Sequence, residues 1–175
     1  MSTLPTLLAS CAKATTAAEA KFRVAYPNAK ERASRIFALD GDGATMMRRI
    51  EQEPWHGARF LTFRSVTSGA RGLDSLPVDA TLTTPDGETV RLSDELKGAD
   101  VAVMIATTGE SAEAAAAIGN ACFVRSIMTT GLIVARHDRR GEVERTMKAL
   151  RPYAAMLVVS TGEEYIPEML TALRA

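Results

Sequence analysis

The sequence predicts an α/β fold: a three-layer, Rossmann-like domain whose mostly parallel sheet carries helices on both faces and one inserted β-hairpin. The first observation is an alternation of strand-like and helix-like segments, repeated roughly every 20 to 30 residues, which is typical of βαβ units. The second is the wholly apolar run Val101–Ala106, as expected for a central strand covered on both faces. The third is Asp86-Gly87 between two alternating runs, which indicates a hairpin.

The elements of the first half follow from local composition. Alanine is the strongest helix former, so the alanine-rich N-terminal stretch predicts a helix that ends before Pro27. The next helix is expected to end before Pro54, and Gly69 and Gly72 favour a loop after the following strand. In order, we expect a helix at 5–24, a strand at 35–39, a turn at 40–43, a helix at 44–52, a strand at 58–64, a loop at 65–76 and hairpin strands at 80–83 and 88–92.

The second half continues the same rhythm. Ser93 begins a short helix with acidic residues in its first turn, and Gly98 ends it. A long alanine-rich helix follows the central strand, and Pro152 closes the helix after that. The expected elements are a helix at 93–98, a strand at 101–106, a helix at 110–127, a strand at 131–135, a helix at 141–150, a strand at 156–160 and a helix at 163–173.

Length and composition indicate a soluble globular protein. The chain has 175 residues, so we expect an N-terminal helix and linker at 1–30 and a single Rossmann-like α/β domain at 31–175. Hydrophobic residues make up 46% and charged residues 24%, an ordinary globular balance. Because Lys plus Arg equals Asp plus Glu at 21 each, the chain lacks the basic excess of nucleic-acid-binding proteins, and no nucleic-acid partner is expected.

The cysteines and the apolar runs predict a cytoplasmic protein. Cys11 and Cys122 lie far apart in sequence and fit neither a disulfide framework nor a zinc site, which favours a reducing compartment. No apolar run reaches the roughly 18 residues of a membrane span. The first ten residues also lack the basic region of a signal peptide. We therefore expect neither a membrane partner nor a metal site.

Three segments are candidate binding sites, because ligands of parallel α/β sheets bind beyond the carboxyl ends of the strands. The first follows the strand at 35–39, and its glycines would let backbone amides approach a phosphate at a helix N-terminus. A tight turn without a ligand is the alternative. The Gly-Asp-Gly sequence is also similar to that of thiamine-diphosphate enzymes, although their asparagine pair has no counterpart at 66–76. The candidate residues are Asp40, Gly41, Asp42, Gly43 and Thr45.

The second candidate segment comprises Thr107, Thr108, Gly109 and Ser111, directly after the central strand. Hydroxyl groups and free amides at the start of a helix can hold an anion. The alternative is that Thr108 or Ser111 simply caps the following helix. Glu110 favours this alternative, because an acidic side chain in that turn already complements the helix dipole.

The third candidate segment comprises Arg136, His137, Arg139 and Arg140, just after the strand at 131–135. Guanidinium groups bind phosphates and carboxylates well, so this segment is the strongest anion-binding candidate. A solvated loop neutralised by its acidic neighbours is the alternative. His137 with Asp138 is the one hint of catalysis, and no nucleophile elbow or Walker motif occurs. Whether the protein is an enzyme therefore stays open, and no catalytic residue or cofactor is assigned.

Three stretches carry a resemblance to a known family. They read RIFALDGDGATMMRRIEQ at 35–52, ELKGADVAVMIATTG at 95–109 and MKALRPYAAMLVVS at 147–160. Together with the order of the elements between 35 and about 166, they resemble the nucleotide-binding domain of the FtsZ/tubulin family. The resemblance implies a Rossmann-like fold with a nucleotide pocket at the carboxyl ends of the strands.

The departures from that family argue against its GTPase activity. The resemblance places the phosphate-wrapping run of glycines and threonines at 110–116, where this chain reads ESAEAAA. Side chains and negative charge thus occupy a place where backbone must contact phosphate. Thr161 and Gly162 stand where the family has a base-recognising asparagine, and the sequence ends at Ala175, so we expect no activation domain. The phosphate-binding signature of the family is lost.

Two functional hypotheses remain. The first is a binding domain for a nucleotide or another small phosphate-bearing or acidic ligand, held by the three candidate segments. The second is a non-catalytic interaction or assembly protein on a degenerate nucleotide-binding fold. Leu4, Leu7, Leu8 and Cys11 recur at helical spacing and would let the N-terminal helix dock a second copy or another protein. The alternative is that this helix covers its own sheet.

Overall fold

A single sheet of seven strands organises the computed structural model, which describes residues 32–67, 78–107, 111–135, 140–173 and 175. Along the sheet the order is β4-β3-β2-β1-β5-β6-β7. The five strands from β2 to β7 in this order are parallel, and β3 and β4 add an antiparallel hairpin at one edge. The strands are β1 (Ser34–Ala38), β2 (Ala58–Val66), β3 (Ala80–Thr83), β4 (Thr89–Arg91), β5 (Val101–Ala106), β6 (Met128–Val134) and β7 (Met156–Ser160).

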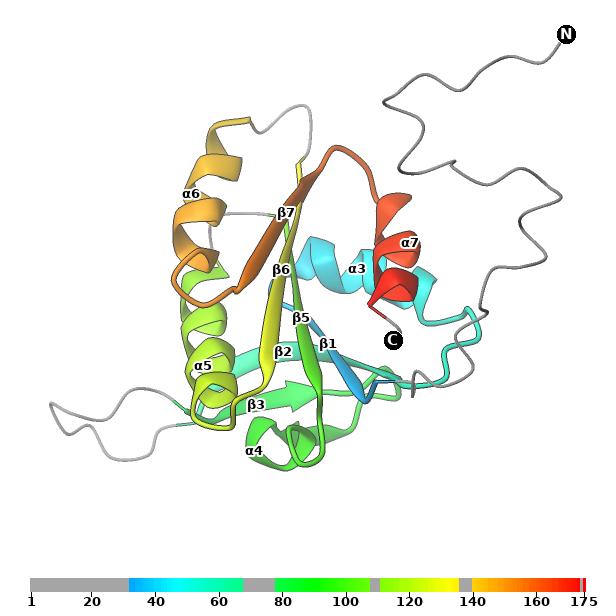
Figure 1. Ribbon diagram of the computed structural model, residues 1–175, viewed down its shortest axis with the longest axis vertical. Coiled ribbons are helices and arrows are strands. Elements are labelled where there is room, and N and C mark those ends of the chain that lie inside the picture. The colour runs from blue at the N-terminus through cyan, green and yellow to red at the C-terminus, as the bar shows by residue number, and fades with distance from the viewer. Residues whose placement is uncertain (1–31, 68–77, 108–110, 136–139, 174) are drawn as a thin grey trace, which may run out of the picture. The chain divides into compact units, whose positions relative to one another are not determined.

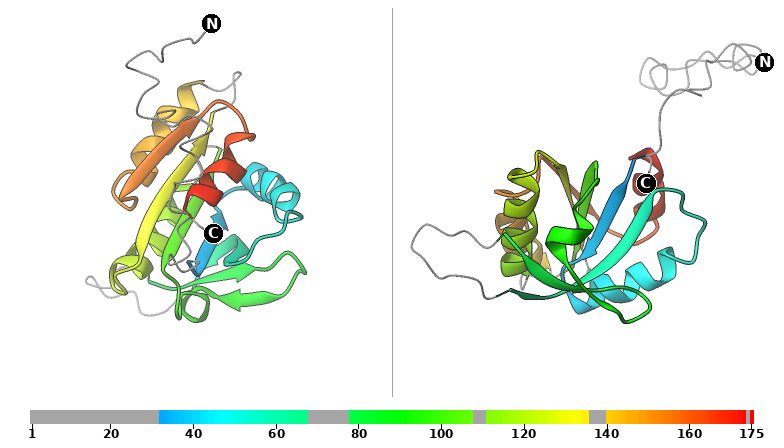
Figure 2. Two further views of the ribbon diagram at one scale, coloured as in Figure 1. Left: turned by 45° about the vertical axis from the view of Figure 1, so that its right-hand side comes forward. Right: turned by 90° about the horizontal axis from the view of Figure 1, so that it is seen from below.

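Helices cover both faces of the sheet, as Figure 1 and Figure 2 show, and complete a three-layer arrangement. The helices α4, α5 and α6 pack on one face, and α3 and α7 pack on the other. The connection from β1 to β2 therefore covers one face, and the connections from β2 to β5, β5 to β6 and β6 to β7 cover the other, as in doubly wound proteins. The helices are α3 (Gly41–Ile50), α4 (Leu92–Glu95), α5 (Ala112–Phe123), α6 (Arg140–Leu150) and α7 (Tyr165–Ala172).

The first strand of the chain lies in the middle of the sheet. β1 pairs with β2 on one side and with β5 on the other, so that Ile36 lies beside both Phe60 and Val103. The parallel strands thus follow the order second, first, third, fourth, fifth, which is one of the two common doubly wound orders. In this order the chain reverses its direction of progress between β1 and β5, and ligands commonly bind at that point.

Two hydrophobic clusters, one on each face of the sheet, form the core. On the face of α5 and α6 the central side chains are Phe37, Met104 and Ile118. On the face of α3 and α7 they include Ile105 and Leu170. Burying each side chain of this size stabilises the fold by about 1.5–3 kcal/mol. Every residue of β5 is buried, which explains why its sequence is apolar throughout.

A buried carboxylate joins β1, β2 and α4. Glu95 in α4 has a side chain that is only 9% exposed, and its Oε2 lies 2.6 Å from Nε of Arg59. The same oxygen lies 3.9 Å from Nε of Arg35, which also donates a hydrogen bond to the Glu95 carbonyl oxygen. Burial lowers the pKa of Arg35, whereas the charge of Glu95 opposes that effect. This ion pair anchors the short helix α4 beneath the sheet.

The structure confirms the predicted α/β class, but several helices and strands begin or end at other residues than predicted. β3 and β7 have the predicted bounds. β6 begins at Met128, three residues early, because the buried β-branched Thr129 and Thr130 extend the strand. The predicted N-terminal helix lies outside the described residues. Within the described part of the chain, no helix combines the length and the apolar character needed to cross a bilayer.

Candidate functional site

The carboxyl ends of β1 and β5 meet at the carboxylate of Asp40. Its Oδ1 accepts hydrogen bonds from the Gly43 amide at 2.7 Å and from the Thr107 hydroxyl at 2.8 Å. Its Oδ2 accepts from the Thr107 amide at 2.6 Å and from the Ser111 hydroxyl at 3.3 Å. Charge-assisted hydrogen bonds of this kind are stronger than neutral ones. Asp40 therefore ties the two central strands together and caps α3.

The predicted turn at 40–43 is wrong in its extent, because the helix already begins at Gly41. Asp40 is the N-cap and Asp42 lies in the first turn, and both oppose the weak helix propensity of the glycines. A β-carbon on Gly43 would lie 3.1 Å from Asp40 Oδ1 and 3.2 Å from the Ile105 carbonyl oxygen. A β-carbon on Gly43 would thus be tightly placed between helix and strand, whereas a β-carbon on Gly41 would contact nothing within 4 Å.

The structure brings together part of the predicted site. Asp40, Gly43, Thr107 and Ser111 share one hydrogen-bond network, as described above, and Gly41 borders it. Thr45 instead donates to the Gly41 carbonyl oxygen at 3.0 Å within its own helix. Five of the predicted residues and the side chain of a sixth lie outside the described residues; these are Thr108, Gly109, Arg136, His137 and Arg139, and the side chain of Arg140.

A cavity of about 500 Å³ adjoins this network on the α3 face of the sheet. β2 continues beyond the end of β1, since Ala38 pairs with Thr62 and the later residues of β2 pair only with β3. The extension of β2, the turn of the hairpin and one side of α3 enclose the cavity. It is lined by Leu39, Asp40, Gly41, Ala44, Met47, Arg48, Glu51, Thr62, Phe63, Arg64, Thr83, Thr84, Pro85 and Gly87.

Two arginines from different elements line this cavity, and threonine hydroxyls orient both. Arg64 of β2 donates from Nε to the Thr83 hydroxyl at 2.8 Å. Arg48 of α3 donates from one terminal nitrogen to the Thr45 hydroxyl at 3.2 Å. Each contact engages only one of the five N–H groups of a guanidinium, so both groups retain donors for a ligand. Neither Arg48 nor Arg64 is recognisable as a site residue from the sequence, because only the folded layers place both on one cavity.

Glu51 supplies the cavity with an unusual acceptor. Its Oε2 is buried and has no hydrogen-bond partner among the described residues. Burial and the negative charge of Asp86 raise the pKa of the Glu51 carboxyl, whereas Arg48 acts in the opposite direction. An unsatisfied buried acceptor is costly, so this oxygen makes the end of α3 locally unfavourable. Glu51 was also missed from the sequence, where it reads as an ordinary helix-end residue.

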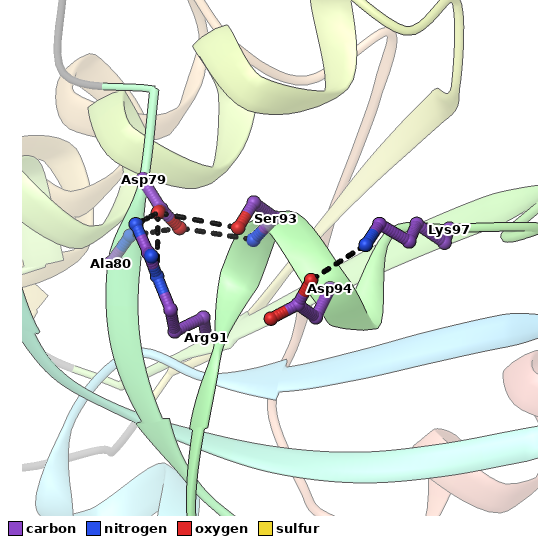
Figure 3. Close-up of polar contacts among 6 residues, drawn as sticks. All are labelled: Asp79, Ala80, Arg91, Ser93, Asp94 and Lys97. Atoms are coloured by element: carbon purple, nitrogen blue, oxygen red, sulfur yellow. Dashed lines mark hydrogen bonds and ion pairs between the residues drawn. The ribbon is translucent and has the colours of Figure 1, made fainter.

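Asp79 fixes the hairpin that forms one wall of the cavity. Its carboxylate accepts hydrogen bonds from the amides of Ala80 and Ser93, each at 3.0 Å, and also pairs with Arg91. Figure 3 shows this cluster beside the separate pair of Asp94 and Lys97. Burial would raise the pKa of Asp79, but the hydrogen bonds from Ser93, Arg91 and Ala80 outweigh it, so the pKa lies below its ordinary value.

The arrangement suits recognition of a polar ligand more than metal binding. Among the described residues, no three His, Cys, Asp or Glu side chains are grouped in a way that could hold a metal ion. The cavity instead combines guanidinium groups, hydroxyl groups and the carboxyl groups of Asp40 and Glu51 within a volume typical of small-molecule sites. Comparison of the sequence with protein-family models and with curated proteins finds no match.

Proposed function

We propose that this domain binds a nucleotide or another small phosphate-bearing or acidic ligand in the cavity between α3, β2 and the hairpin. The observation that carries the proposal is the presence of Arg48 and Arg64 on the same cavity of about 500 Å³. Guanidinium groups recognise phosphate and carboxylate through paired N–H donors, and cavities of roughly 300–1,000 Å³ hold small molecules. The cavity lies at the carboxyl-end edge of the parallel strands, the edge at which doubly wound sheets bind ligands, on the β2 side of β1.

The remaining polar groups of the cavity indicate what else such a ligand carries. The hydroxyls of Thr62 and Thr84 offer both donors and acceptors. A ligand with a hydroxyl or amino group in addition to its anionic group would bond to these threonine hydroxyls while the arginines hold the anion. A ribose phosphate fits this description, and so does a small amino acid derivative.

The network of Asp40 disfavours the N-terminus of α3 as the anion site, and because Asp40 also lines the cavity, we expect the anion at the two arginines. A phosphate at that N-terminus would compete with the Asp40 carboxylate for the Gly43 amide, and the two anions would repel each other. The site predicted from the three loop segments remains a separate prediction, since Arg136 and Arg139 lie outside the described residues. The two sites differ in their arginines, so mutation distinguishes them.

A thermal-shift panel tests the proposal. We would measure the unfolding midpoint with inorganic phosphate, GTP, GDP, ATP, NAD, FAD and thiamine diphosphate, each with and without magnesium. A ligand at a hundred times its dissociation constant adds about 2.7 kcal/mol, which should raise the midpoint by about 5 °C or more. The GTP and GDP samples test the nucleotide that the resemblance to the FtsZ/tubulin family implies.

Variants assign the site. We expect Arg48→Gln combined with Arg64→Gln to abolish the shift, because both anion-binding groups are lost. Arg49→Gln is the matched control, since Arg49 is the next residue of the same helix and pairs with Glu163 at 2.8 Å. The midpoint shift could instead persist in Arg48→Gln combined with Arg64→Gln and disappear in Arg136→Ala combined with Arg139→Ala. That result would assign the ligand to the loop site.

A second candidate function is a non-catalytic interaction or assembly role on a degenerate nucleotide-binding fold. The specific observation in its favour is that Asp40 already occupies the Gly43 amide, one of the groups with which a helix N-terminus binds phosphate. A panel in which no compound shifts the midpoint at millimolar concentration would favour this second candidate. Light scattering before and after deletion of residues 1–24 would then test assembly through the N-terminal segment.

A further inference from the structure

The strand β7 (Met156–Ser160) leaves one edge of the sheet open. It pairs with β6 on one side and is the last strand in the sheet order, so its other side has no neighbouring strand among the described residues. The sequence of β7 is MLVVS, without a charge or a proline, and the side chains of Met156 and Val159 are 43% and 45% exposed. Proteins usually protect such an edge with charges, proline or a bulge.

The opposite edge of the sheet is protected in this way. β4 has only three residues, Thr89–Arg91, and its exposed Arg91 forms an ion pair with Asp79. Short length and a charged side chain both prevent pairing with another chain. The protection of one edge but not the other indicates that β7 is covered in the functional protein.

The charges on either side of β7 show what would cover it. The segment before the strand ends α6 and carries the exposed Arg145, Lys148 and Arg151 and one exposed acidic residue, Glu144, which pairs with Lys148. The segment after the strand begins α7 and carries the exposed Glu164 and Glu168. The edge is thus basic at its beginning and acidic at its end. A second copy in antiparallel orientation would place the basic end of each strand against the acidic end of the other, whereas a parallel copy would oppose like charges.

We propose that two copies of this chain pair through β7, antiparallel across a two-fold axis, so that their sheets form one continuous sheet. A two-fold axis uses the same surface of both copies, which the complementary ends of this edge permit. Main-chain hydrogen bonds would then satisfy the open edge of each strand. In this pairing, the segment around Arg151 of one copy lies against the segment around Glu164 of the other.

Apolar surface beside β7 adds area to the pairing. On the face of α7, a cavity of about 480 Å³ is lined by Leu132, Val158, Tyr165 and Met169 among others. Tyr165 is 53% exposed at its rim. A five-residue strand alone covers little of the roughly 800 Å² per copy that stable interfaces bury, and these flanking side chains supply more. The interface does not involve Arg48 or Arg64, so it is independent of the proposed ligand site.

Light scattering coupled to size-exclusion chromatography tests this pairing on the full chain over a dilution series. We expect a dimer that dissociates on dilution, and a dissociation constant at least about tenfold weaker for Val159→Lys, because lysine at an edge blocks strand pairing. Met156→Lys is a second variant of the same edge. Val78→Lys is the matched control, since Val78 is 43% exposed and lies two residues before β3, on the far side of the sheet.

Charge reversal tests the antiparallel orientation. Arg151→Glu and Glu164→Arg should each weaken the dimer, and the double variant should recover most of the wild-type affinity, because opposite charges then face each other again. Circular dichroism would verify that each variant is folded. A wild-type protein that is monomeric at every concentration would overturn the proposal. A dimer that resists both lysine variants, or a double variant no better than the single ones, would overturn it as well.

Discussion

The carboxylate of Asp40 accepts a hydrogen bond of 2.6 Å from the backbone amide of Thr107, and this contact spans the ends of the two central strands. The two residues are 67 positions apart in the chain. A second bond of 2.8 Å from the Thr107 hydroxyl makes the contact bidentate. Asp40 thus links the carboxyl ends of β1 and β5, the two strands between which the chain reverses its direction of progress across the sheet. Its main role in the described structure is to stabilise this junction.

Replacement of Asp40 by alanine should therefore destabilise the domain. The change removes the cap of α3 and leaves the buried Thr107 without its acceptor, which should cost about 2–4 kcal/mol. Urea unfolding would measure the free-energy difference. Asp94→Asn is the control, since it breaks only an exposed pair with Lys97 and should change stability far less than Asp40→Ala. Equal stability of the two variants would contradict the role given to Asp40.

The two glycines of α3 should respond oppositely to alanine. Gly41→Ala should stabilise the protein by about 0.5–1 kcal/mol, because alanine favours the helix and its β-carbon meets open space. Gly43→Ala gains the same propensity but pushes against Asp40 and the Ile105 carbonyl oxygen, both of which are already hydrogen-bonded. Gly43→Ala should thus be less stable than Gly41→Ala by at least about 1 kcal/mol. Thermal and urea unfolding would compare the pair, and a reversed order would refute the packing argument.

Asp79 should make stability depend on pH in the acid range. Its folded pKa lies below the ordinary 3.8, so its contribution is complete above that value and is lost as the pH falls through the folded pKa. The stability difference between wild type and Asp79→Asn should hold between about pH 7 and 5 and shrink below about pH 4. Urea unfolding of both proteins across this range would show the trend. A difference that is unchanged at about pH 3 would argue against it.

Cys122 should be inert in the folded protein. Its side chain is buried in α5, and burial raises the pKa of the thiol to about 12, although Arg125 acts in the opposite direction. The reactive thiolate is then scarce at about pH 8. In a Cys11→Ser variant, mass spectrometry should detect alkylation by iodoacetamide only after urea unfolding. Rapid and complete labelling of the native variant would show that the thiol is accessible.

Sequence patterns predicted the fold class because the strongest signals are local. The apolar runs of β5 and β7 and the Asp86-Gly87 turn, in which Gly87 has a φ of +87°, depend on neighbouring residues only. The start of α3 was misplaced because Gly41 and Gly43 have poor helix propensity, which the Asp40 cap overcomes in the folded chain. Propensity is a weak guide wherever a tertiary contact decides the outcome.

The candidate site was harder to predict for the same reason. Asp40, Thr107 and Ser111 were selected because strand ends are recognisable in sequence, and the structure places them together. Arg48 and Arg64 come from a helix and a strand that look ordinary by themselves. Only the extension of β2 beyond β1 and the turn of the hairpin place both on one cavity. Such a site forms only when the helices and the sheet pack together, and no local sequence motif predicts it.

The central position of β1 also has a consequence for how the chain is made. β1 pairs with β5, whose last residue is Ala106, so β1 keeps an unpaired edge until synthesis has passed that residue. During that interval Ile36, Phe37 and Ala38, which are completely buried in the finished protein, remain open on one side to other nascent chains. The central strand β1 is therefore made early and completed late, and chaperone demand should be greatest before the middle of the chain has emerged.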